Sequence, residues 1–210
     1  MVTPVLCLFD FDGVLADSMT LYEGMVRTCL ERLGHFFLRD REDFLDLFED
    51  NFYESIGKRG VDVERFNEEI GKILPSVDFR RITAVPGMAA VLAALRERDA
   101  RCVVISSSSS RAIEAVLARE GWSGSFEAVL GADFLLEKIA KIRHAIARWR
   151  RDGEPVFFIG DTAGDIREAR AAGVRTVAVT WGWHSEERLR AAGPDRIVRS
   201  PGDLPALLDR

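Results

Sequence analysis

The chain has 210 residues, of which 47% are hydrophobic and 30% charged, and its formal net charge at pH 7 is −5. This composition is typical of a folded protein of one domain with an insertion, and it excludes a largely disordered chain. The acidic balance and the lack of a basic stripe predict no nucleic-acid partner. The first apolar run is too short for a signal peptide or a membrane span, so we expect a cytoplasmic protein that makes no membrane contact.

The first predicted element is a buried strand over residues 5–9, directly followed by two carboxylates, Asp10 and Asp12. An uninterrupted apolar run of this length is typical of a parallel strand. Because alternate residues of a strand point to the same side, both carboxylates are expected to leave the sheet together. Like charges this close resist joint ionisation unless a cation lies between them or one keeps a proton. The pattern therefore predicts a hard-metal site or a nucleophile beside an acid.

Residues 17–83 are predicted to form a small all-helical domain inserted after the first strand. Apolar residues recur at helical spacing from Leu21 to Cys29 and again from Phe44 to Ile56, and we find no strand pattern. Phe36 and Phe37 are expected in its interior. The dipeptide Pro86-Gly87 marks the return to the main domain, which would comprise residues 1–16 and 84–210.

The remaining chain alternates helices and short apolar strands, which predicts an α/β fold with a Rossmann-like parallel sheet and helices on both faces. Ligands of such folds bind beyond the carboxyl ends of the strands. Helices are expected over 87–98, near 110–120, over 138–150, near 164–172, up to about 192 and near 203–208; strands are expected at 103–105, 126–130, 156–159, 174–179 and 197–198.

Three groups of polar residues fall at the expected binding edge. Ser106 ends one strand, and the next helix begins within a few residues, so its hydroxyl and a main-chain amide at Ser107 are candidate anion contacts. Asp161 follows the strand 156–159, and Asp165, four residues later, lies on the same face if a helical turn begins there. Lys138, or its rival Lys141 one turn later, would supply positive charge to these carboxylates.

Together these residues resemble the haloacid dehalogenase-like superfamily. The resemblance rests on Asp10-Phe11-Asp12-Gly13-Val14, the Ser at the end of the next core strand, the later Lys, and Gly160-Asp161-Thr162-Ala163-Gly164-Asp165. It extends over nearly the whole chain, and the closing stretch Gly193-Pro194-Asp195-Arg196-Ile197-Val198 is similar to the phosphoglycolate phosphatase branch. The helical insertion matches the cap of the superfamily's first subclass.

The resemblance implies a Mg²⁺-dependent phosphatase that acts on a small phosphorylated metabolite, as a monomer or homodimer. Asp10 would attack phosphorus and form an aspartyl-phosphate, and Asp12 would protonate the leaving alcohol and then activate water. Ser106, Ser107 and Lys138 would hold the phosphoryl oxygens. The metal set would comprise Asp10, the main-chain carbonyl of Asp12, Asp161 and Asp165.

Two other activities remain open at this point. One is a β-phosphoglucomutase-like phosphotransferase; the other is a non-enzymatic phospho-acceptor resembling a receiver domain, although such domains have no cap. Lys58 and Arg59 lie in a Gly-flanked turn, where they would meet a second anionic group of the substrate or simply be solvated. His184 follows the strand 174–179, as a second proton carrier or as a structural loop residue.

Overall fold

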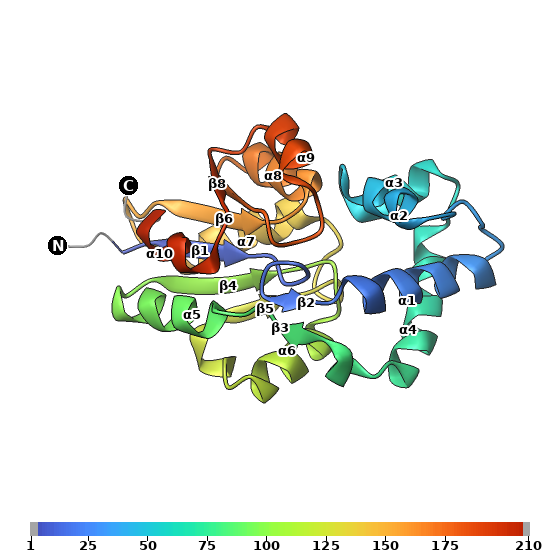
Figure 1. The fold of residues 1–210 in the computed structure, drawn as a ribbon, viewed down its shortest axis with the longest axis horizontal. Helices are drawn as coiled ribbons and strands as arrows, with labels where there is room; N and C mark the ends of the chain where they lie inside the picture. The colour runs from blue at the N-terminus through green and yellow to red at the C-terminus, as the bar shows by residue number, and fades with distance from the viewer. Residues whose placement is uncertain (1–3, 208–210) are drawn as a thin grey trace.

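A six-stranded parallel sheet forms the centre of the computed structural model, which describes residues 4–207 (Figure 1). The strand order is β5-β4-β1-β6-β7-β8, and every neighbouring pair is parallel. The predicted α/β class is confirmed. The strands are β1 (Leu6–Phe9), β4 (Arg101–Ile105), β5 (Ala128–Leu130), β6 (Val156–Gly160), β7 (Arg175–Val179) and β8 (Arg196–Val198).

Helices cover both faces of this sheet, because alternate residues of each strand are apolar on either side. The helices of the main domain are α5 (Met88–Glu97), α6 (Ser110–Arg119), α7 (Lys138–Trp149), α8 (Ala163–Ala171), α9 (Glu186–Ala192) and α10 (Leu204–Leu207), with the 3-10 turns η4 (Ser123–Ser125) and η5 (Pro201–Asp203). On one face Cys7, Phe9 and Phe157 pack with α5, α6 and α10. On the other face Leu8 and Phe158 pack with α7 and α8.

The register of the central strands brings their carboxyl ends to one edge. Phe9 of β1 pairs with Val104 of β4 and with Ile159 of β6. The residues that follow these three strands therefore leave the sheet side by side. Among residues 4–207 we find no helix of the length and apolarity that a membrane crossing requires.

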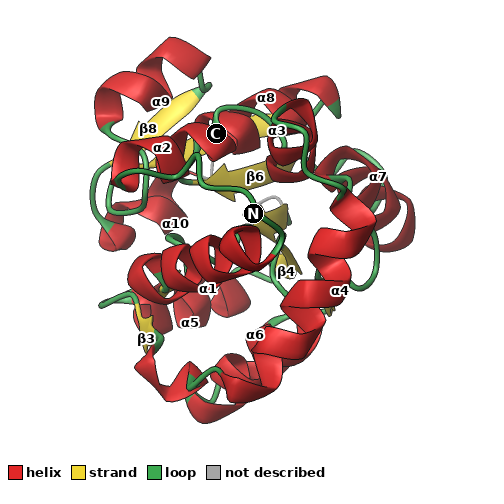
Figure 2. Ribbon diagram, turned by 90° about the vertical axis from the view of Figure 1, so that its right-hand side faces the viewer, coloured by secondary structure: helices red, strands yellow, loops and turns green. Residues whose placement is uncertain are grey.

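The insertion lies at this edge, with its helices in front of β4 and β6 in Figure 2. Its elements are α1 (Met19–Arg32), α2 (Arg41–Leu45), η1 (Asp46–Phe48), α3 (Phe52–Lys58), α4 (Val63–Ile73), η2 (Leu74–Ser76) and η3 (Phe79–Arg81). The apolar spacing from Phe44 to Ile56 is divided among three short elements, because the Asn51 side chain accepts hydrogen bonds from the amides of Tyr53 and Glu54 and begins α3 there.

The prediction that the insertion lacks strands was wrong. A short antiparallel pair joins β2 (Ala16–Asp17) to β3 (Thr83–Ala84), so both ends of the insertion leave the main domain together. The pair has only two residues a strand, which is too short for an alternating pattern to be visible in the sequence.

A separate hydrophobic cluster holds the insertion together. It is rich in aromatic rings, including Tyr22, Phe44 and Phe48, and it takes in Trp183 from the main domain. Phe37 packs at its border, but Phe36 is 74% exposed, so the expectation of a buried Phe36 was wrong. We propose that residues 17–83 form one domain and that residues 1–16 and 84–210 form the other.

Candidate active site

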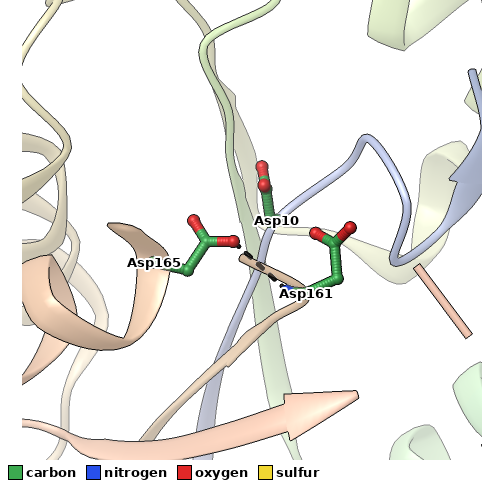
Figure 3. Close-up of side chains that lie close together, drawn as sticks. All are labelled: Asp10, Asp161 and Asp165. Atoms are coloured by element: carbon green, nitrogen blue, oxygen red, sulfur yellow. Dashed lines mark hydrogen bonds between the residues drawn. The ribbon is translucent and has the colours of Figure 1, made fainter. Parts of the chain in front are cut away.

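Three carboxylates converge at the carboxyl edge of the sheet. Asp10 follows β1, Asp161 follows β6, and Asp165 lies in the first turn of α8. One oxygen from each lies within 4.8 Å of the other two, and all three residues are buried. Figure 3 shows their side chains projecting into a shared space. Strands distant in sequence thus deliver the predicted carboxylates to one site.

Asp161 is held by the loops around it. The amide of Trp183 donates to its Oδ2 at 2.7 Å. Gly13 has a φ of +76°, and a Cβ there would lie 2.0 Å from the same oxygen, so only glycine allows this approach. Its other oxygen, Oδ1, is buried and has no hydrogen-bond partner among the described residues. A buried oxygen left in this way requires a further partner.

The two oxygens of Asp165 have different partners. Its Oδ2 accepts hydrogen bonds from the amides of Asp161 and Thr162, at 3.2 and 3.1 Å, and from the Thr162 hydroxyl at 2.8 Å. Together with the bond from its own amide to Thr162, this is a capping box that begins α8. The second oxygen, Oδ1, remains directed to the carboxylate cluster, where it accepts from Lys138.

Lys138 is the cation of the site. Its Nζ lies 3.3 Å from Asp10 Oδ2 and also contacts Asp165 Oδ1. Burial acts to lower the pKa of Lys138, but the adjacent carboxylates of Asp10 and Asp165 outweigh it, and the pKa is raised. Lys141, the rival candidate, lies one turn away and donates to the main-chain carbonyls of Ser106 and Gly131. The tertiary structure thus distinguishes Lys138 from Lys141 as the lysine that contacts the carboxylates, a choice that the sequence left open.

The charges of the cluster do not balance with Lys138 alone. Burial raises the pKa of Asp10 to about 8. The ammonium of Lys138 opposes this rise, and the charges of Asp165 and Asp12 add to it. Burial and the neighbouring Asp165 and Asp10 also raise the pKa of Asp161 well above its usual range. The three carboxylates, which include the unpartnered Oδ1 of Asp161, form the hard, anionic donor set that Mg²⁺ prefers, so the residues present fit this ion.

Asp12 lies at the same edge but in a different environment from Asp10. Its carboxylate accepts hydrogen bonds from Ser18 and Ser108, each at 2.6 Å, and from Ser106 at 3.3 Å. Burial raises the pKa of Asp12, and the three hydroxyl groups oppose that rise. Ser18 and Ser108 were missed at the level of sequence, because both read as ordinary turn or helix-capping residues.

The predicted phosphate contacts lie beside these carboxylates. Ser106 is fully buried, and its hydroxyl accepts from the amide of Ser108 at 2.9 Å while it donates to Asp12. Ser107 lines a compartment of about 20 Å³ with Asp10, Asp12 and Lys138. We call this space the carboxylate compartment. Its volume is that of about one water molecule.

His184 joins the main domain to the insertion. Its Nδ1 accepts from the amide of Ala163, and its Nε2 donates to the carbonyl of Leu45 in the insertion, both at 3.0 Å. Burial lowers the pKa of His184. Both ring nitrogens are therefore occupied by main-chain partners, which is the arrangement of a structural histidine.

Lys58 and Arg59 lie away from the site. Both are exposed; the Lys58 Nζ lies 3.8 Å from Glu54, and Arg59 donates to the carbonyl of Ser55 at 3.0 Å. Neither residue lines the carboxylate compartment. In this structure Lys58 is the last residue of α3 and Arg59 follows it, and both are exposed.

The sheet topology and the carboxylate site define a class of hydrolase with an inserted cap. The sequence profile of the haloacid dehalogenase-like hydrolases matches residues 7–179, and the chain belongs to this family. It is 30% identical over 204 residues to a phosphoglycolate phosphatase of Synechococcus elongatus, covering 94% of this chain and 93% of that protein.

A second relative and a solved structure also match nearly the whole chain. A phosphoglycolate phosphatase of Nitrosococcus oceani is 27% identical over 221 residues, covering 99% of this chain and 97% of the relative. A solved structure of a haloacid dehalogenase-like family hydrolase from Streptococcus pneumoniae superposes with a TM-score of 0.79 at 18% identity, over 97% of this chain and 98% of the other. At that identity the superposition shows the fold alone.

Proposed function

We propose that this protein is a Mg²⁺-dependent phosphatase that hydrolyses a small phosphorylated metabolite through an aspartyl-phosphate, in the cytoplasm and without a nucleic-acid or membrane partner. The observation that carries the proposal is the meeting of Asp10, Asp161 and Asp165 with the Lys138 ammonium in one buried site. Family membership and relatives named as phosphatases support it.

Asp10 is the proposed nucleophile. One of its oxygens forms a bond to phosphorus while the bond from phosphorus to the alcohol oxygen breaks. The amide of Phe11 donates to Asp10 Oδ1 at 2.8 Å, which fixes that oxygen and leaves Oδ2 facing Lys138. Bound Mg²⁺ would supply charge neutralisation for the carboxylates and the phosphoryl group.

Asp12 is the proposed acid and base. Burial raises its pKa, and as the proposed acid it gives a proton to the departing alkoxide. The same carboxylate then takes a proton from water as the water attacks the aspartyl-phosphate, which regenerates Asp10 and releases phosphate. The hydroxyl groups of Ser18 and Ser108 hold Asp12 in place for both steps.

The remaining proposed roles concern binding. Lys138, the Ser106 hydroxyl and the main-chain amide of Ser107 would hold the phosphoryl oxygens and offset their charge. Asp10, Asp161, Asp165 and the main-chain carbonyl of Asp12 would hold Mg²⁺. The insertion would exclude water during the reaction. Because the carboxylate compartment holds about one water molecule, the insertion must move away to admit a phosphoryl group.

Phosphate release tests this proposal. We expect the purified protein to release phosphate from members of a phosphomonoester panel with Mg²⁺ and not with a chelator. The Asp10→Asn variant should release none above background. Release of phosphate at an unchanged rate by that variant would overturn the nucleophilic role of Asp10. A sugar 1-phosphate converted to the 6-phosphate without net release would instead indicate a phosphotransferase.

A further inference from the structure

A second and larger cavity adjoins the carboxylate compartment. It has a volume of about 340 Å³ and lies between α1, α4, η2 and η3 of the insertion and the residues that follow β4 and β5. Asp12, Tyr22 and Ser107 line both spaces. The two are therefore neighbouring parts of one interface between the insertion and the main domain. We call the larger one the apolar cavity.

The side chains around the apolar cavity are mostly aliphatic or aromatic. Its walls include Leu21, Phe66, Ile70, Leu74, Val77 and Phe79. No Lys, Arg or His of the described chain lines it. The charged groups at its wall are the carboxyls of Asp12 and Asp133. Its neutral polar residues are Asn67, Tyr22, Tyr53, Ser18, Ser107, Ser108 and Ser109.

From this lining we propose that the alcohol part of the substrate is uncharged and largely apolar, an alkyl or aryl alcohol rather than a hydroxy acid. The inference rests on the proposed phosphatase function, because it takes Asp12 as the acid that protonates the leaving oxygen. An alcohol whose oxygen faces Asp12 on phosphoryl transfer extends from the carboxylate compartment into the space that Asp12 also lines.

The electrostatics of the apolar cavity act against an anionic alcohol. A carboxylate placed there would lose part of its hydration, find no cation in the wall and lie near the carboxyl of Asp133. Lys58 and Arg59, which the sequence offered as partners for such a group, do not line the cavity. For an apolar group, the free energy of binding becomes more favourable in proportion to the apolar surface that is removed from water.

The volume favours a substrate larger than a two-carbon acid. A cavity of about 150 Å³ lined by aliphatic and aromatic side chains already accepts benzene. The apolar cavity has about twice that volume, so a benzyl-sized alcohol fits with space remaining. The relatives are named for phosphoglycolate, which is the phosphate ester of a hydroxy acid. The substrate class inferred here is therefore different from the one in those names.

A matched pair of esters tests the inference. Benzyl phosphate and 4-carboxybenzyl phosphate have similar leaving groups and differ in one carboxylate; 2-phosphoglycolate is the third substrate. We expect kcat/KM for benzyl phosphate to exceed that for each carboxylated ester at least about tenfold, as burial of an unpaired carboxylate requires. Equal or faster hydrolysis of the carboxylated esters, still dependent on Asp10, would overturn the inference and leave the phosphatase proposal standing.

Two variants of Leu74 refine this test. Leu74 is partly exposed at the wall of the apolar cavity, so a longer polar side chain can be accommodated there without a change of the core. Leu74→Arg should reduce the preference for benzyl phosphate about tenfold by supplying a partner to the carboxylate. Leu74→Gln, which adds polarity without charge, should leave most of the preference intact. If both variants change it equally, the absence of a cation is not the cause.

Binding measured without turnover separates the two proposals. Benzyl alcohol should raise the midpoint of thermal unfolding at millimolar concentrations, whereas 4-(hydroxymethyl)benzoate should not. If no ester is hydrolysed but benzyl alcohol still binds selectively, the phosphatase proposal fails and the apolar binding site stands. If the acid binds as well as the neutral alcohol, the inference about the cavity fails whatever the activity.

Discussion

The carboxylate compartment and the apolar cavity share three residues and differ in almost every other property. The first has a volume of about 20 Å³, is lined by Asp10, Asp12 and Lys138, and comes mainly from the main domain. The second has about 340 Å³, and the insertion supplies much of its wall. If the two proposals hold, the reaction and the choice of substrate depend on different parts of the chain.

Replacement of Asp10 gives the largest expected effect on the first region. Asp10→Asn removes the proposed nucleophile, so turnover should fall by about 10³-fold or more for every ester, charged or apolar. The fold should persist, because burial already disfavours a charged Asp10. Steady-state phosphate release with circular dichroism measures both. A variant that loses activity on carboxylated esters alone would contradict the division between the two regions.

Removal of the metal ion should affect the same region. Mg²⁺ at a hundred times its dissociation constant should stabilise the fold by about 2.7 kcal/mol, visible as a higher midpoint of thermal unfolding. Asp161→Asn should abolish this shift, because Asp161 belongs to the three-carboxylate set. Asp133→Asn is the matched control: it lies at the wall of the apolar cavity and should keep the shift. Loss of the shift in both variants would place the ion elsewhere.

Gly164→Ala should disturb the contact between the two domains. A Cβ at Gly164 would lie 2.5 Å from the carbonyl oxygen of Asp50 and 2.8 Å from that of Phe48, both in the insertion. We expect a loss of about 1–3 kcal/mol in the free energy of unfolding and a lower kcat/KM for all esters, because the insertion can no longer close.

Gly24→Ala provides the control for that substitution. Gly24 lies within α1, and a Cβ there would meet no atom within 4 Å. This change should stabilise the protein by about 0.4–1 kcal/mol through the unfolded state. If Gly164→Ala is equally harmless in denaturant unfolding and kinetics, the approach of the insertion to α8 is not required for activity.

Lys141 is expected to affect the dependence of stability on pH. Burial, with the charge of Lys138, lowers the pKa of Lys141 to about 7, whereas in the unfolded chain it is about 10.4. Between these values the unfolded chain binds a proton that the folded chain does not. The contribution of Lys141 to the free energy of unfolding therefore rises from pH 7 to about 10.

Lys141→Met isolates this contribution. The free energy of unfolding of the parent protein minus that of the variant should increase with pH over this window, by about 1 kcal/mol or more. Urea unfolding at several pH values measures the difference. A difference that is constant or falls with pH would show that Lys141 stays protonated in the folded protein.

The sequence by itself determined the sheet, most element boundaries and the four aspartates of the candidate site. The central strands β1 and β6 each have a continuous apolar run, and the residue that follows such a strand must leave the sheet at its carboxyl edge. That backbone rule places Asp10 and Asp161 at the same edge of the sheet. Their proximity follows from the direct pairing of β1 with β6, which the tertiary structure shows.

Only the tertiary structure decided how those groups divide their work. Asp10 and Asp12 lie two residues apart but have different partners. Asp10 lies in the carboxylate cluster, whereas Asp12 accepts hydrogen bonds from three serine hydroxyl groups. Lys138 and Lys141 lie in the same helix. Lys138 contacts the carboxylates, whereas Lys141 donates to main-chain carbonyls. The apolar cavity exists because the insertion packs against the residues that follow β4 and β5. Local periodicity fixes which face a residue takes, whereas its partners depend on contacts between segments far apart in the chain.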